Sequence, residues 1–290
     1  TTLEEQERLD EAKKILAKVN LQAQPKVLIE LNRLARSEEV NFDVVADLIS
    51  QDVSLSAKML KLASSPMYSR GQKFGSVQEA LMAIGFEEFR NCFTSVTLSD
   101  FMSQVGYPYK GFWDHSRRVA VLCRELANLL ARRVVDLAYT LGLFHDVGAV
   151  IIPLHNRDYV EHIHRALPLY FGITELEYKM VKTNHCAVGE LFCRNWGLHE
   201  DILAALRYHH RPEMDASLSK GSKSLKAILQ LAELYNDKWD AGSELLAPFE
   251  KSKETLANIG DVLGRDPEEL QDLESELQQR VQDNLAAMGS

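Results

Sequence analysis

The chain has few of the residues that interrupt helices, since its 290 residues include only eight prolines and 15 glycines. Alternating runs of β-branched side chains, which are typical of half-buried strands, are also scarce. These two shortages argue against a sheet protein, and apolar side chains instead recur at helical spacing. We therefore predict an all-α fold, in which an N-terminal helical subdomain packs on a helical bundle.

Cysteine is equally rare. The four cysteines show no CxxC spacing and fall within apolar helical patterns; they are Cys92, Cys123, Cys186 and Cys193. A chain of this length can bury about three quarters of its unfolded surface, so it folds without disulfides. We interpret all four as reduced core residues, which is typical of a cytoplasmic protein.

Long hydrophobic runs and an excess of basic residues are missing as well. No apolar run reaches the ~18 residues that a membrane span needs, and the polar N-terminus is unlike a signal peptide. Asp and Glu number 42 against 33 Lys and Arg, which gives a net charge of −9. Because nucleic-acid binding depends on a basic surface, we expect neither nucleic acid nor a membrane as a partner.

Turn-forming residues divide the chain into three predicted parts. Residues 1–105 contain short helices with few ionisable groups on their apolar faces, and they form the predicted N-terminal helical subdomain. The segment 104–111 is rich in turn formers and marks a boundary. Polar side chains enter the apolar faces in the predicted helical core, residues 106–240. Residues 241–290 form a C-terminal extension of charged amphipathic helices.

An imidazole and a carboxylate, His145 and Asp146, stand side by side in the apolar stretch Gly142–Gly148. Burying either group without a partner is costly. A divalent metal ion would relieve both costs, because imidazole and carboxylate are among its ordinary ligands. Inner faces of neighbouring predicted helices offer more such groups, and the full set of candidate metal ligands is His115, His145, Asp146, His185, His209, His210 and Glu233.

A single histidine on an apolar face is more often a hydrogen-bonded core residue than a ligand. Five of the nine histidines lie on inner faces together with two acids, and a site for one or two metal ions explains them better. Seven ligands are too many for one tetrahedral zinc; they better fit two metals about 3.5–4 Å apart, of the kind that clamp a phosphoryl group and generate hydroxide. Mixed imidazole and carboxylate ligation favours Fe, Mn or Zn over Mg. The other histidines are expected on the solvated surface: His155, His162, His164 and His199.

The stretch Gly142–Gly148 resembles the HD signature of the HD-domain superfamily, whose members are helical metal-dependent phosphohydrolases. Its surroundings resemble more specifically the HDOD family, the HD-related output domain of bacterial signalling proteins. The resemblance covers roughly residues 20–238. It is carried, in order, by Pro25-Lys26-Val27, Ile49–Leu55, Leu60–Ser65, Ser76–Leu81, Trp113–Ser116, His185–Gly189, Trp196–Leu198 and Tyr208–His210.

The resemblance implies a signalling or interaction module on an HD-like helical bundle. HDOD proteins are similar to HD and HD-GYP phosphodiesterases but have usually lost part of the metal site. This chain matches the HD-GYP ligand positions, except that Glu233 stands where that type has Asp. Two departures count against catalysis: Ala149 replaces a Lys often found after the HD signature, and 211–213 lack the Gly-Tyr-Pro segment.

Two functions stay open. The first is a non-enzymatic signalling module with a structural or sensory metal, which binds a signalling protein through its N-terminal subdomain or C-terminal helices. The second is a metal-dependent phosphohydrolase acting on a nucleotide or another phosphate ester. In that case the candidate phosphate contacts are Arg117, Arg118, Lys182 and Arg211.

Overall fold

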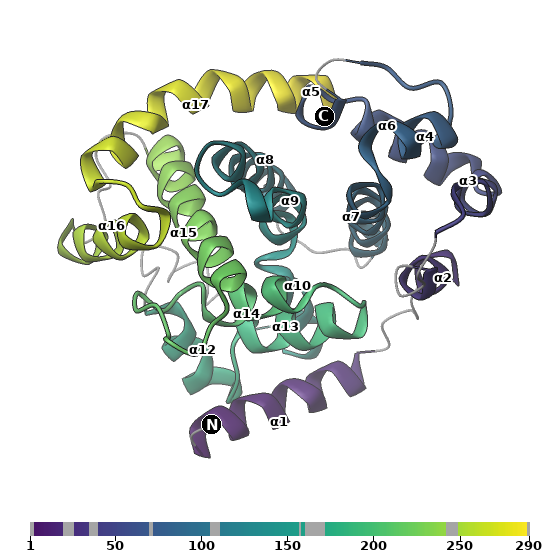
Figure 1. The fold of residues 1–290 in the computed structure, drawn as a ribbon. Helices are drawn as coiled ribbons and strands as arrows, with labels where there is room; N and C mark the ends of the chain where they lie inside the picture. The colour runs from purple at the N-terminus through teal and green to yellow at the C-terminus, as the bar shows by residue number, and fades with distance from the viewer. Residues whose placement is uncertain are drawn as a thin grey trace. The chain divides into compact units, whose positions relative to one another are not determined.

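The computed structural model describes residues 3–19, 26–34, 40–69, 72–104, 111–156, 158–159, 172–241 and 249–288. Every regular element within these ranges is a helix, so the predicted all-α class is confirmed (Figure 1). The chain forms two compact units. The first, called the core unit below, consists of Thr1–Leu21 and Gly111–Leu277, and the second consists of Gln22–Lys110 and Gln278–Ser290.

The second unit is a set of mostly short helices. They are α2 (Lys26–Leu34), α3 (Phe42–Ser50), α4 (Val53–Ala63), α5 (Pro66–Ser69), α6 (Val77–Ile84) and α7 (Phe86–Gln104). Local capping explains where α6 begins and ends. Ser76 Oγ accepts from the Glu79 N–H at 3.1 Å, and Glu79 Oε2 accepts from the Gly75 N–H at 2.8 Å. The helix ends at Gly85, whose φ of 83° suits a residue without a Cβ.

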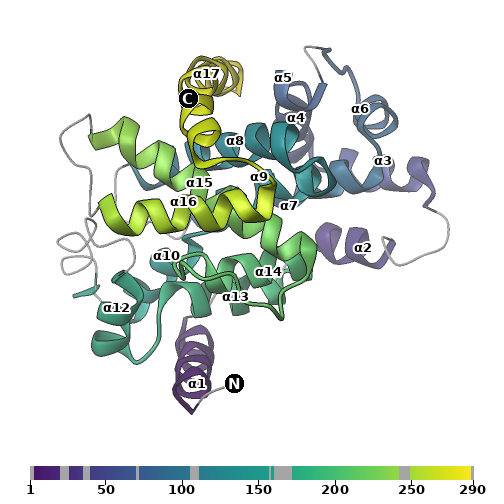
Figure 2. The same ribbon diagram turned by 60° about the vertical axis from the view of Figure 1, so that its left-hand side comes forward.

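The core unit is built on longer helices. They are α1 (Leu3–Lys18), α8 (Phe112–Leu130), α9 (Val135–Phe144), α10 (Val147–His155), α12 (Ile173–Val181), α13 (His185–Asn195), α14 (Glu200–Tyr208), α15 (Lys220–Ala241), α16 (Phe249–Leu263) and the first part of α17 (Pro267–Met288). Helix α8 packs against α9 and α15, whereas α13 packs against α10 and α14 (Figure 2). The two packing groups are joined by the junction between α9 and α10 and by the contact of α14 with α15.

The compact units differ from the predicted ranges at the N-terminus, because α1 belongs to the core unit and not with the rest of residues 1–105. Helix α1 lies against α13 (Figures 1 and 2). Its apolar stripe is covered there, with Ala12 and Ile15 fully buried. The Thr183 hydroxyl also donates to the Arg8 carbonyl at 2.7 Å. Sequence periodicity shows that α1 has an apolar face, but not which distant helix covers it.

Two glycines let helices of the core unit approach one another closely. A Cβ on Gly148 would lie 2.0 Å from the His185 carbonyl oxygen, so the start of α10 touches the backbone at the start of α13. A Cβ on Gly142 would lie 2.7 Å from Ala120 Cα, which brings α9 against α8. Both approaches exclude any larger residue. They set the distance between the segment 142–148 and its neighbours.

Arg132–His155 is the one described stretch that is long and apolar enough to cross a membrane, with a mean hydropathy of 1.5. It comprises the 3-10 turn Arg132–Val134 followed by α9 and α10. Within it, 78% of the apolar window is buried inside the structure, which is typical of core helices.

Candidate metal centre

Elements of the core unit bring all seven predicted ligands into one cluster. Helix α8 contributes from its first turn, and the α9–α10 junction contributes two neighbouring residues. Further groups come from the first residue of α13, the two residues after α14, and the middle of α15. In that order the side chains are His115, His145, Asp146, His185, His209, His210 and Glu233.

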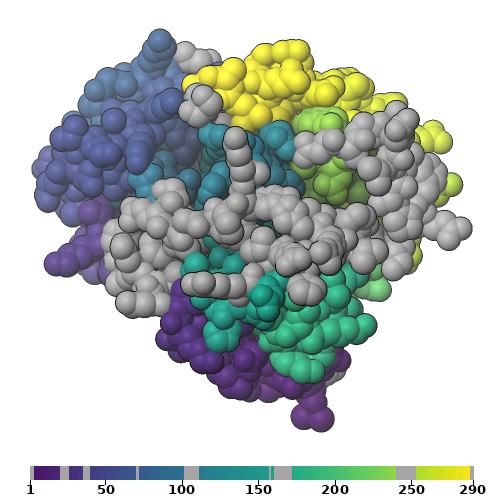
Figure 3. All heavy atoms as spheres, turned by 180° about the vertical axis from the view of Figure 1, so that it is seen from behind, coloured from purple at the N-terminus to yellow at the C-terminus, as the bar shows by residue number. Residues whose placement is uncertain are grey.

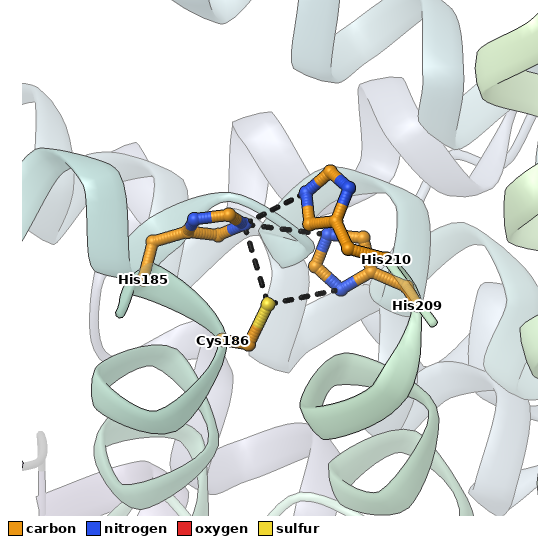
Figure 4. Close-up of side chains that lie close together, drawn as sticks. All are labelled: His185, Cys186, His209 and His210. Atoms are coloured by element: carbon orange, nitrogen blue, oxygen red, sulfur yellow. Dashed lines mark hydrogen bonds between the residues drawn. The ribbon is translucent and has the colours of Figure 1, made fainter. Parts of the chain in front are cut away.

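One group of side chains in this cluster consists of His185, Cys186, His209 and His210, all of them buried (Figure 4). His185 Nε2 lies 3.0 Å from His210 Nε2 and 3.4 Å from His209 Nε2. It also lies 3.4 Å from Cys186 Sγ. Donor atoms around a tetrahedral zinc stand about 3.3–3.6 Å apart, given the usual Zn–N and Zn–S bond lengths. The spacing therefore fits a single four-coordinate ion.

A second group consists of His115, His145 and Asp146, with Glu233 beside it. His145 Nε2 lies 3.1 Å from Asp146 Oδ2, 3.2 Å from His115 Nε2 and 3.6 Å from Glu233 Oε1. His145 is fully buried and Glu233 nearly so. These atoms are close enough to surround a second cation.

Asp146 lies between the two groups. Its Oδ2 faces His145, whereas its Oδ1 lies 3.3 Å from His185 Nε2 and 3.7 Å from His209 Nε2. Oδ1 is buried and, among the described residues, has no hydrogen-bond partner of good geometry. A buried carboxylate oxygen of this kind is costly without a partner. A cation between the imidazoles and Asp146 would supply one, so the residues present fit a metal ion.

Backbone carbonyl groups orient two of the buried imidazoles. Nδ1 of His145 lies 2.7 Å from the Gly142 carbonyl oxygen, and Nδ1 of His209 lies 2.7 Å from that of Leu206. A carbonyl can only accept, so each Nδ1 carries the proton in the neutral ring. Each Nε2 is left with its lone pair toward the cluster. Metal-binding histidines are usually held in this way.

Glu177 orients the third imidazole. Both of its carboxylate oxygens lie 2.8 Å from His185 Nδ1, and one accepts from the His185 N–H at 3.1 Å. The buried Tyr159 hydroxyl donates to the same carboxylate. Glu177 is fully buried, and it lies four residues after the buried Ile173 on one face of α12. An acid in line with an apolar residue was the available sequence signal for this contact.

His115 is held in the opposite sense. Arg118 Nε donates to Asn236 Oδ1 at 2.9 Å, so the Asn236 amide nitrogen faces His115 Nδ1, at 3.0 Å, as a donor. The neutral His115 ring then carries its proton on Nε2, toward His145 and Asp146. In this arrangement His115 presents an N–H, and not a lone pair, to the second group. Asn236 was missed by the sequence analysis, although it lies one turn after Glu233 on α15.

The electrostatics of the cluster follow from burial and from its neighbouring charges. Burial lowers the pKa of His210 well below its usual value, and the nearby His209 and His185 lower it further. Burial would raise the pKa of Asp146, but His145 beside it brings that pKa well below the usual value. Burial also opposes ionisation of Cys186, yet His185 and His209 lower the pKa of its thiol to about 7. Metal ions bind the neutral form of imidazole and the deprotonated forms of a carboxyl group and a thiol.

Cys186 was predicted as a reduced core residue, and it is a buried free thiol. It was not among the predicted ligands, although it directly follows His185. Two of the histidines expected on the surface, His155 and His199, are exposed. His162 and His164 lie outside the described residues.

Comparisons with known proteins bear on the fold. A family model for the HDOD domain matches residues 21–212. An HDOD domain protein of unknown function from Geobacter sulfurreducens superposes with a TM-score of 0.73 at 24% identity, covering 98% of this chain and 97% of that one. A protein from Shewanella amazonensis SB2B named "Putative phosphohydrolase" gives 0.70 at 21% identity, covering 95% and 98%. At these identities the likeness shows the fold.

Among curated proteins, an uncharacterized protein of Treponema pallidum (strain Nichols) is 23% identical over 192 residues, which is 64% of this chain and 37% of that protein. The chain spans about a third of the length of the curated relatives it matches.

Proposed function

The chain belongs to the HDOD domain family, and from that premise we propose that it is a signal-transduction module whose core unit binds a divalent metal ion. The observation that carries the proposal is the buried Oδ1 of Asp146. It faces two imidazole nitrogens without a hydrogen bond, at the centre of a cluster that has the spacing of a metal site.

The first ion would be held by His185, Cys186, His209 and His210, with Asp146 beside it. A thiolate among imidazoles favours zinc or iron over manganese. A second ion would need His115, His145, Asp146 and Glu233. Because the His115 ring presents an N–H to this group, occupancy of the second position depends on a shift of that proton.

In this proposal the ion has a structural and sensory role. The cluster joins the α9–α10 junction to the start of α13 and the end of α14, so an ion there would hold these elements at one spacing. Its loss would free them and change the surface offered to other proteins. The partner is proposed to be a signalling protein that docks on the N-terminal subdomain, residues 1–105, or on the C-terminal extension, residues 241–290.

Elemental analysis of protein purified without added metal tests this proposal. Wild-type protein should contain Fe, Mn or Zn near one or two equivalents. His209→Ala should lose most of it, because His209 faces both Asp146 and His185. The control is His155→Ala, which removes an exposed imidazole at the end of α10. Metal absent from every preparation, or equal in both variants, would contradict the proposal.

A second candidate function is a metal-dependent phosphohydrolase acting on a nucleotide or another phosphate ester. The observation that favours it is the second group of acids and imidazoles, since the two groups together would supply ligands for two ions. A bound ion would supply a Lewis acid for a phosphoryl oxygen. Turnover of a panel of phosphodiesters by metal-loaded protein separates the two functions, because the signalling module predicts binding without turnover.

A further inference from the structure

A small cavity of the core unit opens beside the candidate metal centre. Its volume is about 30 Å³, enough for about two water molecules. Cys186 and His210 of the cluster line one side of it. The lining also includes Glu5 and Arg8 of α1 together with Arg207 and Arg211, which come from α14 and the segment after it. A ligand here would touch the metal cluster and these charged groups at once.

The cavity is rich in guanidinium groups. Its lining contains three arginines, Arg8, Arg207 and Arg211, and one carboxylate, Glu5. Carboxylates outside the lining also pair with two of them: Glu4 and Glu175 with Arg8, and Glu190 with Arg207. Arg8 Nε is buried and has no hydrogen-bond partner among the described residues. The ring of Tyr208 supports two of the arginines, with the Arg211 and Arg207 guanidinium carbons 4.8 Å and 5.8 Å from its centroid. Planar guanidinium groups match the oxygens of phosphate in geometry and charge.

Glu5 occupies the position where an anion would lie. Arg211 Nη2 donates to Glu5 Oε1 at 2.9 Å, and the Glu5 side chain is 19% exposed. Glu5 lies in the first turn of α1. Space-filling atoms of α1, in purple, lie against the green atoms of residues 172–200 in Figure 3.

We infer that Arg8, Arg207 and Arg211 recognise a phosphate-bearing ligand beside the metal cluster, and that the Glu5 carboxylate fills this site in the ligand's absence. The inference rests on the proposed function only for its link with the metal. Glu5 is then an intramolecular competitor. Binding of the ligand then replaces the Glu5 carboxylate on Arg211.

Calorimetric titration of metal-stripped protein with inorganic phosphate tests the site apart from the metal. Glu5→Gln removes the competing charge and should bind phosphate at least about fivefold more tightly than wild type. The double variant that carries Glu5→Gln and Arg211→Gln should bind phosphate at least about tenfold more weakly than the single variant Glu5→Gln. That factor corresponds to one lost charge-assisted hydrogen bond. Arg211→Lys in the same background should fall between them, because it retains charge without the planar fork.

The matched control is Glu11→Gln, which makes the same change on α1 at a residue that pairs with Lys14 and does not line the cavity. It should bind phosphate as wild type does. Equal phosphate affinity in wild type, Glu5→Gln and the double variants would overturn the inference. Phosphate that binds only to metal-loaded protein, and equally with or without Arg211, would also overturn it while leaving the metal site intact. Stripped protein that responds as expected supports the cavity site even where no metal is retained.

Discussion

At the scale of single residues, the fully buried Glu177 acts on the cluster through His185. Its carboxylate bonds both Nδ1 and the backbone N–H of His185. Glu177→Gln keeps the size of the side chain but removes the charge. We expect the metal affinity to fall by about 10–100-fold, which is typical of the loss of such an orienting partner. Competition with a fluorescent chelator measures it.

Glu175→Gln is the control, since Glu175 lies on the same helix but is 59% exposed and pairs with Arg8. Its metal affinity should equal that of wild type. If the two variants bind metal alike, Glu177 does not orient a ligand.

The protonation of the cluster predicts how metal binding depends on pH. Burial alone would lower the pKa of His185 and of His209. The Cys186 thiolate and Glu177 instead raise the pKa of His185 well above its usual value. The pKa of His209 is raised in the same way by the Cys186 thiolate and Asp146. A raised pKa means that a proton competes with the metal up to a higher pH. The Cys186 thiol, with its pKa of about 7, must lose a proton as well.

The apparent metal affinity should therefore fall as pH is lowered from about 8 to 6, by more than tenfold per pH unit, because more than one proton must be displaced. Titration at several pH values with a competing chelator gives the slope. A Cys186→Ser variant should show a shallower slope. A slope no steeper than that of one histidine would count against the proposed set of ligands.

The sequence predicted the residues of the cluster better than the residues around them. Histidines and acids on apolar faces stand out, because such groups are seldom buried without a purpose. Cys186 did not stand out, because a buried cysteine is ordinary. Thr174 and Glu177 have the spacing of a capping box, yet Gly172 stands at the N-cap and Glu177 is buried, so the box does not form. Tertiary packing decides which of several possible partners a polar side chain bonds, and a local sequence pattern carries no information about that packing.

At the scale of helices, Gly148 sets the contact of α10 with α13. Gly148→Ala would place a Cβ 2.0 Å from the His185 carbonyl, and the backbone must shift to admit it. We expect the free energy of unfolding to drop by about 1–3 kcal/mol or more, as for other overpacked contacts, together with a clear loss of metal affinity. Denaturant unfolding and chelator competition measure the two effects.

Gly75→Ala makes the same change where the nearest atom is the Glu79 carboxylate at 3.5 Å. It should alter stability by less than about 0.5 kcal/mol, as surface substitutions usually do. Equal effects of the two substitutions would show that the close approach is unimportant.

The helices themselves were largely predictable. Ser76 and Glu79 cap the start of α6, and Pro267 opens α17, because caps and first-turn residues act locally. The partner of α1 was not predictable in this way. The contact of Ala12 and Ile15 with α13 joins residues more than 150 positions apart, and helical periodicity carries no information about such pairs.

At the scale of the whole molecule, metal removal should destabilise the protein by mass action. An ion that binds only the folded chain adds about 2.7 kcal/mol when its free concentration is 100 times the Kd. Chelation should therefore lower the midpoint of thermal unfolding of wild-type protein, as seen by calorimetry. His209→Ala should already unfold at the lower temperature and should not respond to chelator. A variant that still responds would show that the stabilising ion binds elsewhere.

The division of the chain into units has a practical consequence for trimmed versions of the protein. The stretch that defines the family, residues 21–212, omits α1 and α15 alike. A protein cut to those limits would keep the central histidine pairs. It would lack Glu233 and Asn236, whose amide fixes the proton position on His115. It would also lack α1, which carries both Glu5 and Arg8. Such a fragment would be a poor substitute in any binding assay, because the residues missing from it contribute to both the metal cluster and the cavity beside it.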